Sequence, residues 1–193
     1  MDRLGGEAKH SPIHPRELHQ GRREWAGRIA TILRPAPVYG RGNEANLAAF
    51  VRQIRRGRPC MVGAGEVRKS VVGRGNLCAA IGFLLARDEP GYEIYNVSDA
   101  ETFSVAGLAR LAASLGGWPT PKSIPATLAT LVAPLGDVVG YPTGRDFPLT
   151  TSRLRALHEE SVFPCDKLVA AGFRQPKRTQ NELLEMIEWP PAR

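Results

Sequence analysis

The chain has few cysteines, and their arrangement excludes two classes of protein. Cys60, Cys78 and Cys165 are odd in number and show no C-x-x-C spacing. Such a set provides neither the disulfide framework of a small secreted domain nor the ligands of a structural zinc site, and it is typical of a reducing compartment. His10, His14 and His19 lie close in sequence, but Pro12 and Pro15 keep them off a shared helical face. We therefore expect no metal site.

Long apolar runs are also lacking. The longest, residues 77–86, is about half of the ~20 residues that span a bilayer. The first residues, MDRLGGEAKHSPIHP, lack the apolar core of a secretory signal peptide. From these two absences we expect a cytoplasmic protein that does not associate with membranes.

Acidic residues are outnumbered by basic ones. The 26 Lys and Arg against 19 Asp and Glu give a net charge of +7, which suits nucleic acid, an acidic membrane surface or a phosphorylated small molecule. A basic surface without a specific partner is the alternative. Arg52, Arg55, Arg56 and Arg58 form a basic run, but aromatic residues do not interleave with it. We therefore interpret the run as a solvated helix face and do not expect nucleic acid.

What is present indicates one soluble α/β domain. A chain of 193 residues with 42% hydrophobic and 23% charged residues can bury one core. Residues 1–27 are polar and broken by Pro12 and Pro15, so we expect them to be poorly ordered and residues 28–193 to fold. Helical and strand patterns alternate, which favours an α/β chain with crossover connections. The expected strands are 28–33, 59–62, 69–72 and 92–97. One expected helix begins after Asn43 and ends at Gly57, and another begins after Ser104 and ends at Gly116. Further helices are expected at 77–85, 126–132, 152–158, 165–170 and 181–188.

The turn at residues 40–45, Gly-Arg-Gly-Asn-Glu-Ala, fits the formal dinucleotide pattern G-x-G-x-x-A. Residues 35–39 separate it from the preceding strand, and the nearest candidate for a ribose-binding acid, Glu66, falls in a turn. We therefore interpret the turn as a helix start that attracts a substrate phosphate, since helix N-termini offer unpaired N–H groups. The alternative is that Asn43 and Asn46 only cap the helix.

The segment 34–43, RPAPVYGRGN, resembles the "RPxxVYGPG" segment of the extended short-chain dehydrogenases, the NAD-dependent epimerase/dehydratase family. Further family patterns follow in order at 95–98, 104–116 and 172–176, so the resemblance covers about residues 29–188. In the family this segment lies well past the middle of the chain. The resemblance implies an N-terminally truncated, C-terminal substrate-binding half: a partial Rossmann-like fold, with the last parallel strands and helices, plus a small, mostly helical substrate-binding lobe.

The resemblance also implies substrate-binding residues. Asn46 is similar to an asparagine that contacts the pyrophosphate, Arg68 to an arginine of a "G-x-x-x-R-x-x-x-V" segment, and Arg153 to a nucleoside contact. The planar fork of arginine pairs well with phosphate oxygens. For Arg68 the alternative is a solvated turn arginine. Gly75 stands where the family pattern has an acid.

Hydride chemistry in this family requires a Gly-rich NAD loop and a Tyr-x-x-x-Lys pair. None of Tyr39, Tyr92, Tyr95 and Tyr141 has a lysine four residues on. We therefore assign no catalytic residue, and we expect NAD or NADP to belong to the intact family rather than to be bound by this chain alone.

The implied function is to bind a nucleotide sugar, such as a UDP- or dTDP-sugar, which intact relatives epimerise, dehydrate or oxidise. Three alternatives stay open. In the first, the chain is a non-catalytic subunit that completes a sheet supplied by another chain. In the second, it is a gene fragment without function. In the third, it is a relative of sterol- or flavanol-type reductases, since Pro37 stands where many sugar epimerases carry Asn.

Overall fold

The computed structural model describes residues 29–43, 46–87, 91–131 and 159–189. Segment 1–27, the helix expected at 152–158 and Arg153 lie outside these ranges. The strands are β1 (Ile29–Pro35), β2 (Val38–Tyr39), β3 (Pro59–Val62), β4 (Arg68–Lys69), β5 (Val72–Gly73), β6 (Gly91–Val97), β7 (Phe103–Ser104) and β8 (Lys122–Ile124). The helices are α2 (Asn46–Arg55), α3 (Arg74–Leu85), α4 (Val105–Gly116), α7 (Asp166–Ala170) and α8 (Thr179–Glu188). Residues 126–131 are also helical.

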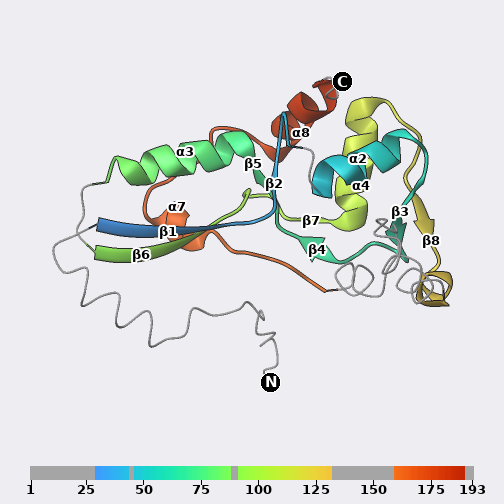
Figure 1. The fold of residues 1–193 in the computed structure, drawn as a ribbon, viewed down its shortest axis with the longest axis horizontal. Helices are drawn as coiled ribbons and strands as arrows, with labels where there is room; N and C mark the ends of the chain where they lie inside the picture. The colour runs from blue at the N-terminus through green and yellow to red at the C-terminus, as the bar shows by residue number, and fades with distance from the viewer. Residues whose placement is uncertain (1–28, 44–45, 88–90, 132–158, 190–193) are drawn as a thin grey trace, which may run out of the picture.

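The longest paired strands form the Rossmann-like part. β1 and β6 run parallel, from Ile29 opposite Gly91 to Pro35 opposite Val97. In Figure 1, α3 runs alongside this pair and α7 lies beside it. Tyr95 and Val97 share one core cluster with Leu84 of α3 and Leu168 of α7. Parallel strands need a long connection, and here α3 lies within it.

A helical lobe forms the other end of the molecule (Figure 1). Its core includes Val51 and Ile54 of α2, Leu108 of α4 and Leu183 of α8. α2 is amphipathic because its apolar residues recur at helical spacing, and that face packs against α4. β3 and β8 run parallel beside these helices. A partial α/β fold with a mostly helical lobe is thus confirmed.

Local signals predict several helix ends. Ser104 caps α4, where its Oγ accepts a hydrogen bond from the N–H of Gly107 at 3.0 Å. Gly57 follows α2 with a φ of +62°, as expected of a helix-ending glycine. At α4 the prediction is wrong by one residue: Gly116 is still helical, and Gly117, with a φ of +64°, adopts the left-handed conformation.

The prediction of one strand at 69–72 is wrong, because the structure has two separate strands there, β4 and β5. β4 pairs antiparallel with β7, whereas β5 pairs parallel with β2. The chain changes partners at Ser70 and Val71, which are both buried. A pattern of local hydrophobicity does not reveal such a change, because it depends on strands that are distant in sequence.

Within the described ranges, no helix has the length and apolarity needed to cross a membrane.

Candidate functional site

The turn between β2 and α2 is fixed at both ends. Gly40 and Gly42 have φ values of +141° and +77°, in a region of backbone conformation that residues other than glycine rarely adopt. The side-chain amide of Asn43 donates to the carbonyl of Val38 at 2.8 Å, and a guanidinium N–H of Arg74 donates to the carbonyl of Arg41 at 2.7 Å. The turn is therefore anchored to β2 and to the start of α3.

Asp99, two residues after the end of β6, is the centre of a buried polar network. Its Oδ2 accepts from the hydroxyl of Tyr39 at 2.8 Å and from that of Thr179 at 3.1 Å. Its Oδ1 accepts from the side-chain amide of Asn76 at 2.8 Å and from the N–H of Gly73 at 3.1 Å. Asp99 is 3% exposed, so these four donors replace its water. One carboxylate thus joins β2, β5, α3 and α8.

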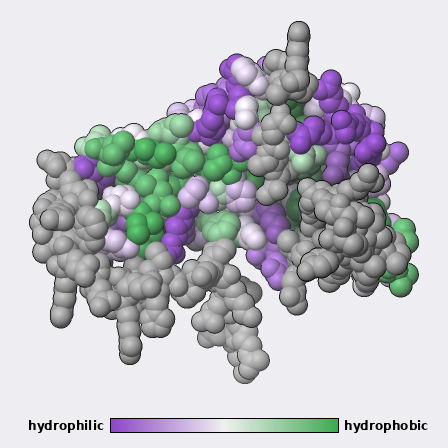
Figure 2. All heavy atoms as spheres, in the orientation of Figure 1, coloured by the Kyte–Doolittle hydropathy of each residue, from purple (hydrophilic) through white to green (hydrophobic). Residues whose placement is uncertain are grey.

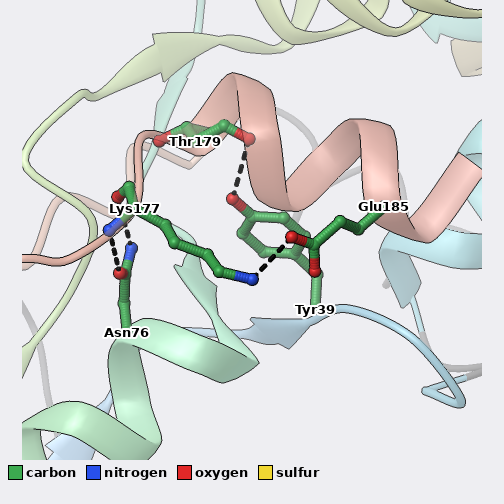
Figure 3. A network of polar contacts seen from close by, with 5 residues as sticks. All are labelled: Tyr39, Asn76, Lys177, Thr179 and Glu185. Carbon is green, nitrogen blue, oxygen red and sulfur yellow. Dashed lines mark hydrogen bonds and ion pairs between the residues drawn. The ribbon is translucent and has the colours of Figure 1, made fainter.

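A second set of contacts extends this network to the surface (Figure 3). The side-chain amide of Asn76 donates to the carbonyl of Lys177 at 3.0 Å, and the N–H of Lys177 donates to Asn76 Oδ1 at 3.1 Å. Lys177 Nζ forms an ion pair with Glu185 at 2.6 Å on α8. The start of α8 is therefore held against the start of α3.

The hydroxyl of Tyr39 has a structural role, because it donates a hydrogen bond to Asp99. Burial raises its pKa far above the ordinary value, and the charge of Asp99 and the hydrogen bond to it act in the same direction. A tyrosine that remains protonated cannot serve as a general base near neutral pH.

Glu182 explains the glycine at position 75. Its side chain is 3% exposed and lies against Gly40, Gly73 and Gly75. A Cβ added at Gly75 would lie 2.1 Å from Glu182 Oε1. Within the described residues this oxygen has no hydrogen-bond partner. The carboxylate beside position 75 therefore comes from α8, not from the position where the family pattern has an acid.

A hollow of about 180 Å³ lies beside Arg68. It is formed by the turn at residues 62–67 together with Val105. Arg68 follows this turn in β4, is exposed and pairs with Ser104. The neighbouring Lys69 donates to Ser161 Oγ at 3.4 Å, and partial burial lowers its pKa. Arg68 is thus exposed one residue after the turn that forms the hollow.

The predicted substrate residues lie on separate elements that share one neighbour. Asn46 is the first residue of α2, although its side chain is outside what is described. α2 packs on α4, and Arg68 pairs with the residue that caps α4. Arg153 lies outside the described residues. The residues that organise the site, Asp99, Asn76 and Thr179, were not predicted; the only local signal was a polar residue at the end of a parallel strand.

The G-x-G-x-x-A turn does not fit a dinucleotide. β2 does run directly into Gly40, contrary to the separation expected from the sequence. A dinucleotide fold also requires the strand after the helix to join the same sheet. Here β2 pairs with β5, whereas β3, which follows α2, pairs with β8. The described ranges also contain no cluster of three metal-binding side chains.

Comparison with known proteins gives two curated relatives, and no protein-family model matches. N-acetyl-alpha-D-glucosaminyl-diphospho-ditrans,octacis-undecaprenol 4-epimerase of Escherichia coli O157:H7 is 28% identical over 190 residues, covering 89% of this chain and 57% of the relative. Chloroplast stem-loop binding protein of 41 kDa b of Arabidopsis thaliana is 27% identical over 120 residues, covering 58% of this chain and 32% of the relative.

Solved structures share the fold. UDP-glucose 4-epimerase of Thermotoga maritima, solved with UDP-glucose, has a TM-score of 0.55 and 21% identity, over 84% of this chain and 46% of that one. The Thermus thermophilus UDP-glucose 4-epimerase, solved with NAD, has a TM-score of 0.56 and 20% identity, over the same shares. Neither these structures nor the curated relatives favour the alternatives that the sequence left open.

The chain spans about half the length of the relatives that it matches. Its segment order, its parallel strands and its match to a sugar epimerase agree with the patterns read from the sequence. By sequence and fold the chain thus resembles the NAD-dependent epimerase/dehydratase family over about half the length of the relatives that it matches.

Proposed function

We propose that this chain provides the substrate-binding part of an epimerase or dehydratase that acts on a sugar carried by a diphosphate. The observation that supports this most strongly is the similarity over 89% of the chain to an epimerase whose named substrate is a sugar diphosphate. Structural neighbours were solved with UDP-glucose and share the fold. The group common to these ligands is the diphosphate.

We assign diphosphate binding to Asn46 and Arg68, and a nucleoside contact to Arg153. α2 has ten residues, so its first turn offers unpaired N–H groups to an anion. Arg68 is exposed beside the 180 Å³ hollow, where a bidentate contact to a phosphate would be open to a ligand. The anchored turn at residues 40–43 holds the chain that leads into α2.

Turnover requires groups that the described residues do not supply. NAD or NADP would carry hydride to and from the sugar, but the turn at Gly40 does not fit a dinucleotide. We therefore propose that an NAD-binding α/β unit associates with β1 and completes the sheet. Ile81 and Leu85 on α3 are 40% and 80% exposed, and Figure 2 shows a hydrophobic surface over α3.

Calorimetric titration with UDP-N-acetylglucosamine, dTDP-glucose and NAD tests the proposal. We expect both sugar nucleotides to bind and NAD to give no heat. Arg68→Ser should weaken binding about tenfold, because a charge-assisted contact contributes about 1.5 kcal/mol. Arg178→Ser, which removes an exposed arginine at the start of α8, is the matched control. If neither sugar nucleotide binds, or if both variants weaken binding equally, the assignment is wrong.

A further inference from the structure

The helical lobe has an unusual charge distribution. We define the basic lobe as residues 46–65 and 103–131, which contain α2, β3, β7, α4, β8 and the helix at 126–131. It contains no Asp or Glu, and its basic residues are Arg52, Arg55, Arg56, Arg58, Arg110 and Lys122. Six positive charges minus no negative ones give +6, nearly the whole net charge of +7. The other parts of the chain are close to neutral.

Several of these charges are exposed on adjoining elements. Arg55, Arg56 and Arg58 are exposed at the end of α2 and just before β3. Lys122 is exposed in β8, where it lies opposite Pro59, the residue after Arg58. The charges therefore form one strip across α2, β3 and β8. Figure 2 shows hydrophilic surface over the end of the molecule that holds α2.

The acids nearest the lobe in sequence are Glu66 and Glu101, which are both exposed. α8, which packs on α4, brings three more. Glu182 is buried, and Glu185 is paired with Lys177. Glu188 is exposed near the end of α8. Three exposed acids, Glu66, Glu101 and Glu188, against six basic residues leave a net positive surface, which attracts polyanions.

Apolar side chains are exposed at the same end of the molecule. The helix at 126–131 directly follows β8 and is visible in gold in Figure 1. Its Ala129 is fully buried, whereas Leu128 and Leu131 are 50% and 74% exposed. Leucines three residues apart on a helix share a face, so the two form one apolar projection, which follows the opposite end of β8 from Lys122.

This combination fits an anionic bilayer better than a nucleic acid. Single-stranded nucleic acid binds on exposed aromatic rings, but the aromatic residues of the lobe, Phe50, Phe103 and Trp118, are packed against its core. Basic side chains together with exposed leucines are a combination by which a protein lies on a membrane interface. We propose that the basic lobe is a docking surface for the anionic surface of a lipid bilayer, a peripheral contact that does not require a long apolar run.

Sedimentation with lipid vesicles tests this proposal independently of sugar binding. We expect the chain to bind vesicles of phosphatidylcholine and phosphatidylglycerol, but not phosphatidylcholine alone. Arg55→Ser with Arg56→Ser should weaken binding about 30-fold, since each surface arginine contributes about 1 kcal/mol. Arg174→Ser with Arg178→Ser removes the same charge from exposed positions outside the lobe, and this control should bind almost as well as the native chain.

A second variant separates insertion from charge attraction. Leu128→Asn with Leu131→Asn should abolish the binding that persists at about 0.5 M salt, where charge attraction is screened. Thermal melts show that each variant is folded. Equal binding to both vesicle types, equal weakening by the two arginine pairs, or binding of a single-stranded RNA without binding of vesicles would overturn the proposal.

Discussion

Asn76 and Lys177 hydrogen-bond to each other in both directions, the side-chain amide of Asn76 donating at 3.0 Å and its oxygen accepting at 3.1 Å. Asn76 is fully buried in α3, and its amide also donates to Asp99. One side chain thus satisfies a carboxylate, a backbone carbonyl and a backbone N–H. These contacts join the two halves of the fold at the turn of the candidate site.

Asn76→Ala should therefore lower the free energy of unfolding by about 2–4 kcal/mol, because it leaves several buried polar groups without partners. Urea denaturation measures the change. Asn96→Ala is the matched control: this half-buried amide makes one long contact of 3.4 Å to Pro164, so its loss should cost about 0.5 kcal/mol or less. Equal losses in both variants would contradict the role of Asn76.

Gly75→Ala should destabilise the protein by about 1–3 kcal/mol, because the added methyl meets the carboxylate of Glu182 at 2.1 Å. Combining it with Glu182→Ala should cost less than the sum of the single changes, since the second change removes the clash. Gly82→Ala, in the same helix, meets nothing within 4 Å and should stabilise by about 0.5–1 kcal/mol. Additive effects at positions 75 and 182 would exclude the proposed contact.

Tyr39 should make the protein sensitive to alkali. Its folded pKa is raised above the ordinary value of about 10, chiefly by burial, so the folded state holds its proton more tightly than the unfolded state. This contribution is fully present below pH 10 and is lost as the pH rises beyond it. Tyr39→Phe should therefore flatten the fall of unfolding free energy between about pH 10 and 11, as measured by urea midpoints. Parallel curves for both proteins would show that Tyr39 ionises normally.

The cysteines should differ in reactivity. Cys78 is exposed, whereas Cys60 is half-buried and burial raises the pKa of its thiol. Because the thiolate is the reactive form, Cys78 should react faster with a disulfide reagent at pH 8. Cys78→Ser should remove the fastest phase of the reaction, and Cys60→Ser should leave it intact. Loss of the fast phase in the Cys60 variant would reverse the assignment.

Much of the fold was predictable because its signals are local. β3 has the predicted bounds, and the cap at Ser104 depends on residues within three positions of it. The partners of β4 and β5 were not predictable, since each strand has two residues and pairs with a different distant segment. The helical lobe followed from the family pattern rather than from local propensity.

The candidate site was less accessible from sequence. Asn46 and Arg68 could be chosen from a resemblance, but their binding roles stay predictions. Asp99 was missed because its importance comes from four donors on separate elements, which no spacing in the sequence reveals. Gly75 was interpreted as a missing acid, although it makes room for Glu182 from the other end of the chain.

The contact between Tyr39 and Thr179 joins residues 140 positions apart. Closing such a loop must precede the gain from its contacts, which slows folding. During synthesis the turn at residues 40–43 leaves the ribosome long before α8 exists to hold it. The candidate site therefore takes its final form only after α8 has been synthesised, and a chain ending before residue 179 would carry the turn without its anchor.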